Sequence, residues 1–125
     1  MSEKKKAMIC QPMRGLTDEE ILSKRAEAKA FLENLGYEVI NTFFDRSESE
    51  GIKNRPLYCL SKALSKMADC DTVYFCKGWE DARGCVIEHN AAAEYGLNIL
   101  DEKLIEEFNI SHPELDKAPV DDMIV

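Results

Sequence analysis

Short apolar runs divide the chain at regular intervals. The runs at residues 7–11, 37–44, 72–76 and 97–100 are rich in strand-forming residues and end at turn residues, a pattern typical of buried strands. Between them lie three stretches whose apolar residues recur three and four apart, which predicts three amphipathic helices. This alternation predicts a parallel sheet with helices on both faces, a doubly wound (flavodoxin-like) α/β three-layer sandwich of four to five strands.

Capping residues mark the ends of the predicted helices. Thr17 and Glu20 form a capping-box pattern before the first helix, and Gly36 follows its last turn. Pro56 suits the first position of the second helix, and Gly96 ends the third. The inner stripe predicted for the first helix consists of Ile21, Arg25, Ala28, Leu32 and Leu35.

The periodic pattern weakens after residue 101. Residues 1–101 are therefore interpreted as one α/β domain, and residues 102–125 as a C-terminal extension with a short helix over 103–108 and an acidic tail. Residues 45–55 lack periodicity and predict a long surface loop, of the kind that often covers a site.

Composition narrows the possible partners. With 125 residues the chain has the length of a single domain, and 16 Lys and Arg against 24 Asp and Glu give a net charge of −8. This charge argues against a nucleic-acid polymer and against an anionic membrane surface as partners. No apolar stretch approaches the roughly 20 residues of a membrane span, so we expect a cytoplasmic protein.

The five cysteines show neither a Cys-x-x-Cys pair nor a matching histidine motif. We therefore expect no metal site, no cofactor and mostly buried, reduced thiols. Cys85 is the exception, because it follows Arg83 and Gly84 near a predicted helix start, where a thiolate can be stabilised.

Ligands of open parallel sheets bind at the carboxyl ends of the strands, which here lead into residues 11–17, 41–55 and 77–88. The first of these loops joins a strand to a helix start, where backbone N–H groups, the helix dipole and a guanidinium suit a phosphate. The alternative is an ordinary turn with an exposed arginine. The candidate binding residues of this loop are Gln11, Met13, Arg14, Gly15 and Thr17.

Residues 79–88 form the second candidate cluster. Glu88 falls on or beside the apolar face of the third predicted helix, where an unpaired carboxylate is costly. The alternative is a solvent-facing glutamate paired with Arg83 or His89. Asp81 alternatively caps this helix, and Trp79 is alternatively a core or rim aromatic.

Four segments together resemble the nucleoside 2-deoxyribosyltransferase-like superfamily, and within it a group common in phages and bacteria. They are Ile9-Cys-Gln-Pro-Met-Arg-Gly15, residues 35–40, residues 71–88 and the Ala-rich residues 91–96. The most specific element is Asp81-x-x-Gly84-x-x-x-Glu88. The resemblance covers residues 7 to about 100.

Members of this superfamily cleave or exchange the N-glycosidic bond of nucleosides or nucleoside monophosphates, and they assemble as oligomers. The resemblance implies that Glu88 is the nucleophile, that Asp81 assists the sugar or base, and that Arg14 and Gly15 hold the sugar or its 5′-phosphate. A carboxylate suits this chemistry, because the bond breaks through an oxocarbenium-like state. The further expected substrate contacts are Asn41, Trp79, Arg83 and Gly84.

We therefore expect N-glycosidic bond cleavage or transfer on a nucleoside 5′-monophosphate or nucleoside, by a homodimer or larger homo-oligomer. Hydrolysis is favoured over transfer, since Arg14 suits a phosphate and residues 54–56 lack the aspartate that the transferases use for the base. The alternative is a non-catalytic module of the same fold that binds a nucleotide-derived ligand. A third reading is a structural subunit whose acidic tail recruits a partner.

Overall fold

The computed structural model describes residues 4–43 and 46–111 and contains one parallel sheet. Its four strands are β1 (Lys6–Cys10), β2 (Glu38–Val39), β3 (Thr72–Phe75) and β4 (Asn98–Asp101), in the order β2-β1-β3-β4. β1 pairs with β2 on one side and with β3 on the other, and all pairs are parallel. The predicted doubly wound α/β sandwich is confirmed, with the lower of the two predicted strand counts.

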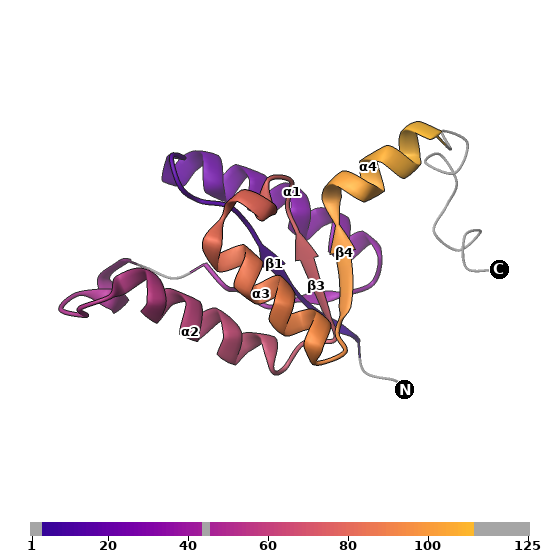
Figure 1. The fold of residues 1–125 in the computed structure, drawn as a ribbon. Coiled ribbons are helices and arrows are strands. Elements are labelled where there is room, and N and C mark those ends of the chain that lie inside the picture. Colours follow the sequence, from indigo (N-terminus) through magenta and orange to yellow (C-terminus); the bar gives the residue numbers. More distant parts are fainter. Residues whose placement is uncertain (1–3, 44–45, 112–125) are drawn as a thin grey trace.

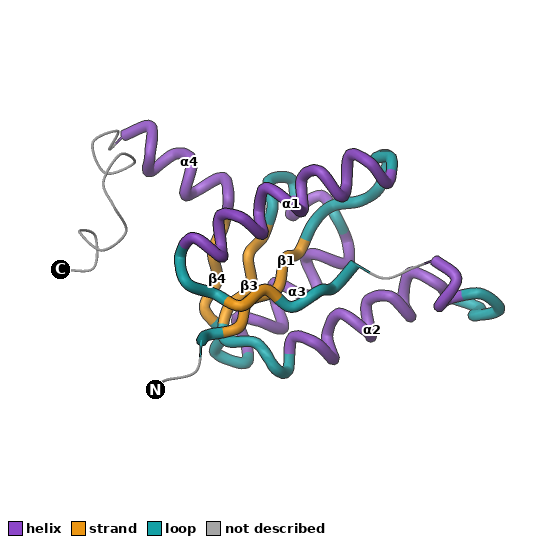
Figure 2. Tube along the Cα trace, turned by 180° about the vertical axis from the view of Figure 1, so that it is seen from behind, coloured by secondary structure: helices purple, strands orange, loops and turns teal. Residues whose placement is uncertain are grey.

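The helices form the two outer layers. α1 (Asp18–Asn34) covers one face of the sheet, and α2 (Arg55–Met67) and α3 (Arg83–Glu94) cover the other (Figures 1 and 2). α4 (Glu102–Ser111) follows β4 directly and projects beyond the sheet (Figure 1). Short 3-10 turns occur at Arg46–Ser49 and Trp79–Asp81.

Alternate residues of the strands build two core clusters. Ala7 and Ile9 of β1 pack toward α1, whereas Met8 and Cys10 pack toward α2 and α3. This follows from the strand geometry, since successive side chains point to opposite faces. Cys10, the last residue of β1, is thereby placed on the α3 side of the sheet.

The second strand is shorter than the apolar pattern of residues 37–44 predicts. Its ladder ends after Ile40, whose N–H donates to the carbonyl of Ala7. After Ile40, side chains form hydrogen bonds with the backbone in place of the strand ladder. Asn41 Oδ1 accepts from the N–H of Phe43, and Thr42 Oγ1 donates to the carbonyl of Ile9 at 3.2 Å. Side-chain hydrogen bonds to the backbone compete with a strand ladder, so the chain turns here instead of extending the sheet.

The ends of α1 lie where the capping residues predict them. Both hydrogen bonds of the Thr17–Glu20 capping box are present, and Gly36 has a positive φ of 97°, which favours glycine after a helix. Asp81 does not cap α3, the alternative role considered for it, because the N-cap is Ala82 and no side chain caps this helix. α2 begins at Arg55 behind an Asn54 cap, one residue before the predicted start.

The short helix expected in the extension is α4, which begins at residue 102. The acidic tail, residues 112–125, lies outside the described residues. Within residues 4–43 and 46–111, no helix is both long enough and apolar enough to cross a membrane.

Candidate active site

A cleft of about 1400 Å³ opens at the carboxyl edge of the sheet. β1 and β3 lie side by side there, and the chain leaves them toward helices on opposite faces. Such a reversal of strand order is where open α/β sheets bind ligands. The walls come from the end of β1 and the loop after it, from α1, from the segment after β2, and from the first turns of α2 and α3.

The cleft gathers seven of the residues singled out from the sequence, which come from two distant segments. These are Gln11, Met13, Arg14, Asp81, Arg83, Gly84 and Glu88. Four others do not line it: Gly15, Thr17, Asn41 and Trp79.

Glu88 lies in the cleft wall and is only 8% exposed. Together with Cys85 and Ala92 it forms the buried face of α3, at spacings of three and four residues. Its Oε2 accepts a hydrogen bond from the Cys10 thiol, with 2.8 Å between sulfur and oxygen. Burial raises the pKa of Glu88, whereas the Cys10 hydrogen bond and the charge of Arg25 oppose this rise.

The solvent-facing alternative for Glu88 is wrong. Arg83 is exposed, and His89 stacks on Trp79 with 4.1 Å between the ring centroids. Neither residue forms a hydrogen bond or ion pair with Glu88 in the described part of the chain. Glu88 is therefore a buried carboxylate whose one hydrogen-bond donor, among the described residues, is a neutral thiol.

Cys10 and Cys85 accompany Glu88 in the cleft wall. Hydrogen bonding with Cys85, burial and the charge of Glu88 raise the pKa of Cys10 far above its usual range, so this thiol stays protonated. Cys85 is buried in the core rather than poised as an exposed thiolate, and Cys59 is the exposed cysteine. The donor atoms of Cys10, Cys85 and Glu88 all lie within 4.8 Å of one another, a sulfur and oxygen set that a zinc-like ion accepts.

Arg25 is a site residue that sequence reasoning missed. It lines the cleft from α1 and is 8% exposed, and its Nη1 donates to Thr42 Oγ1 at 3.0 Å. Its Nε has no hydrogen-bond partner in the part of the chain that the structure describes. Burial lowers the pKa of Arg25, although nearby Cys76, Cys10 and Glu88 favour its charged form. The available signal was an arginine inside the apolar stripe of the first helix.

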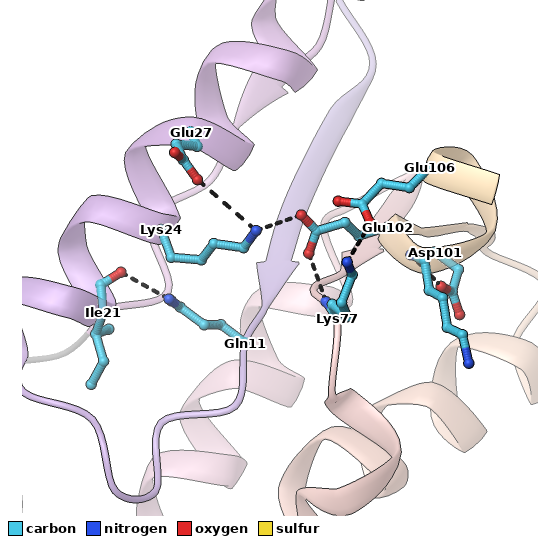
Figure 3. Close-up of polar contacts among 9 residues, drawn as sticks. Gln11, Ile21, Lys24, Glu27, Lys77, Asp101, Glu102 and Glu106 are labelled. Carbon is cyan, nitrogen blue, oxygen red and sulfur yellow. Dashed lines mark hydrogen bonds and ion pairs between the residues drawn. The ribbon is translucent and has the colours of Figure 1, made fainter. Parts of the chain in front are cut away.

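Gln11 is buried where β1 gives way to its loop. Its Nε2 donates to the carbonyl of Ile21 in α1 at 2.8 Å (Figure 3), which fixes the orientation of the amide. The other amide atom, Oε1, has no hydrogen-bond partner among the described residues. Gln11 thus connects the loop to α1 and leaves a buried acceptor in the cleft wall.

Residues of the capping box themselves form hydrogen bonds with backbone N–H groups at the start of α1. Thr17 Oγ1 accepts from the N–H of Glu20, and the Glu20 carboxylate accepts from the N–H of Thr17. The first turn also carries three acids, Asp18, Glu19 and Glu20. These negative charges occupy the positive end of the helix dipole, where an anion was expected.

Trp79 has a packing role. Its ring contacts Phe75 and His89, and its indole N–H donates to Asp101 Oδ2 at 2.9 Å. These contacts tie the 3-10 turn before α3 to the end of β4. Asp81, two residues later, is exposed at the cleft rim.

A known protein family matches most of the chain. The sequence model described as "Domain of unknown function (DUF4406)" matches residues 5–101, the region from β1 to β4. Neither the curated proteins nor the solved structures gave a match. Since the match covers most of the chain, including all four strands and the cleft, the protein belongs to the DUF4406 family.

Proposed function

We propose that the protein cleaves the N-glycosidic bond of a nucleoside 5′-monophosphate or nucleoside, with Glu88 as the nucleophile and water as the final acceptor. The observation that carries this proposal is the position of Glu88, a buried carboxylate with a raised pKa in the wall of an open cleft. Such perturbed carboxylates concentrate at catalytic sites. The resemblance to the nucleoside 2-deoxyribosyltransferase-like superfamily gives the same residue the same role.

The chemistry proceeds in two balanced steps. A Glu88 oxygen bonds to the anomeric carbon while the bond from that carbon to the base nitrogen breaks, and the base leaves with the electron pair. Asp81, exposed at the rim, suits proton delivery to the departing base. Water then attacks the anomeric carbon of the glycosyl ester and gives a proton back to Asp81, which releases the sugar and restores the Glu88 carboxylate.

The test is an incubation of purified protein with a panel of nucleosides, their 5′-monophosphates and NAD, with free base followed by chromatography. Glu88→Gln is compared with Glu94→Gln, a matched change at an exposed position of the same helix. We expect wild type and Glu94→Gln to release base, and Glu88→Gln to lose at least about a hundredfold in rate. Unchanged release by a folded Glu88→Gln protein would remove Glu88 from the mechanism.

A second candidate is a module that binds a nucleotide-derived ligand without turning it over. It is favoured by the hydrogen bond from Cys10, which already engages the carboxylate that would have to attack. Its signature is a melting temperature raised by a nucleotide, with no free base released from any compound of the panel.

A further inference from the structure

A buried cation without a carboxylate partner forms part of the cleft wall. Arg25 is 8% exposed, and no ion pair connects it to an acid of the described residues. Among the described residues, its one hydrogen bond goes to the neutral hydroxyl of Thr42, which in turn donates to the carbonyl of Ile9. Its Nε is buried and finds no acceptor in residues 4–43 and 46–111.

This arrangement is energetically costly. A buried charge normally has a paired partner, since its transfer out of water is compensated only by opposite charge and hydrogen bonds. The charge of Glu88 favours the ionised form of Arg25, but no ion pair between the two is found among the described residues. The missing partner of Arg25 is therefore best supplied from the cleft, by a ligand that carries an oxyanion.

The other places for an anion are less suitable. The N–H groups at the start of α1 are engaged by the capping box, and the three acids of that turn repel negative charge. Arg14 lines the cleft as well, but it is exposed and remains solvated. A desolvated guanidinium interacts more strongly with an oxyanion than a solvated one does.

We propose that Arg25, positioned by Thr42, is the anchor for the phosphate group of the ligand. This inference rests on the proposed function and narrows it: the substrate is the nucleoside 5′-monophosphate rather than the free nucleoside. Thr42 orients the guanidinium through Nη1, so the hydroxyl acts on the ligand through Arg25. The uncompensated charge is then a cost that the phosphate offsets on binding.

Binding is measured at constant ionic strength by calorimetric titration with inorganic phosphate, which has no glycosidic bond to cleave. Arg25→Gln is compared with Lys29→Gln, which removes one positive charge from an exposed position one turn further along α1. We expect Arg25→Gln to weaken phosphate binding at least about tenfold, and Lys29→Gln to leave it within about twofold. Without phosphate, we expect Arg25→Gln to be as resistant to urea as wild type or more so, because a buried unpaired charge is removed.

Two further variants separate the contribution of Arg25 from those of Thr42 and Arg14. Thr42→Val retains the size of the side chain but removes the hydrogen bond to Nη1, and we expect it to weaken phosphate binding less than Arg25→Gln does. Arg14→Gln tests the loop. Phosphate binding that is lost in Arg14→Gln but retained in Arg25→Gln would overturn the inference, as would an Arg25→Gln protein that is destabilised yet binds phosphate like wild type.

Failure of this inference differs from failure of the proposed catalysis. Arg25-dependent phosphate binding without base release by wild type would retain the anion site and reject the enzyme. Base release that is equally fast from nucleosides and 5′-monophosphates, and unaffected in Arg25→Gln, would retain the enzyme and reject the anion site.

Discussion

Two glutamates of equal solvent exposure, Glu88 and Glu102, have opposite electrostatic surroundings. Each is 8% exposed. Glu102 accepts hydrogen bonds from the ammonium group of Lys24 and from the backbone N–H of Lys77, the latter at 2.7 Å (Figure 3). Glu88 accepts one hydrogen bond, from the thiol of Cys10.

The pKa values move accordingly. Burial works against ionisation at Glu102, but the hydrogen bonds from Lys24 and Lys77 outweigh it and lower the pKa. At Glu88 burial dominates, and its pKa rises. Glu102 joins the start of α4 to α1 and to the segment after β3, so its interactions hold the fold together. The comparison teaches that the donors around a carboxylate, and not its burial alone, decide whether its pKa falls or rises.

The largest expected effect is that substitution of Glu102 lowers stability but not activity, whereas substitution of Glu88 lowers activity but not stability. Glu102→Gln leaves the donors of Lys24 and Lys77 without their anion, so we expect it to lose about 1–3 kcal/mol of unfolding free energy and to keep base release. Glu88→Gln removes a buried charge, so we expect equal or higher unfolding free energy and no base release. Urea unfolding and base-release assays of both variants measure these two effects. A Glu88→Gln protein that is less stable than Glu102→Gln would contradict the contrast drawn between the two glutamates.

The hydrogen bond from Cys10 offers a finer test. Cys10→Ala removes the donor that lowers the pKa of Glu88, so the acid limb of the base-release profile should move to higher pH. Cys76→Ala is the matched control, since Cys76 is a buried thiol in the core cluster on the opposite face of the sheet. We expect Cys10→Ala to lose about 1 kcal/mol more unfolding free energy than Cys76→Ala. Identical pH profiles of the two variants would show that Cys10 only fills space.

The smallest expected effects are opposite pH slopes of stability. The usual glutamate pKa is 4.5. Because the folded pKa of Glu88 is raised, its contribution is present below pH 4.5 and is lost as the pH rises through the folded value. Because the folded pKa of Glu102 is lowered, its contribution is present above pH 4.5 and is lost as the pH falls through the folded value.

Urea unfolding of wild type and both variants from about pH 3 to about pH 8 resolves these slopes. The stability of Glu88→Gln relative to wild type should rise above pH 4.5. The deficit of Glu102→Gln should shrink below pH 4.5. Parallel curves for the two variants would mean that the two carboxylates do not differ in the way described.

Local patterns predicted the fold because each depends on neighbours in the sequence. The period of apolar residues places a helix or strand, and the capping box of Thr17 depends on residues three positions apart. The second strand was the exception. Its apolar composition extends through residues 40–44, but the side chains of Asn41 and Thr42 bond to the backbone and end the ladder after Ile40.

Two signals in the sequence predicted lining residues of the cleft: the loops at the carboxyl ends of the strands, and a polar residue in an apolar pattern. Glu88 attracted attention as a carboxylate on an apolar helix face, and it lies in the cleft wall. Arg25 shows the same conflict in the first helix, where the periodic pattern alone places it in the apolar stripe. The indole of Trp79 is turned toward Asp101 and away from the cleft, which its neighbours in the sequence do not determine.

The sequence by itself determined the α/β alternation, the helix caps and the edge of the sheet where a site belongs, because these depend on short-range periodicity and on parallel topology. Only the tertiary structure decided which groups meet at that edge. The Cys10–Glu88 hydrogen bond spans 78 positions, and the Arg25–Thr42 hydrogen bond joins α1 to the segment after β2. Their surroundings also set the charge state of each group, since a pKa depends on the burial and the donors that distant segments supply.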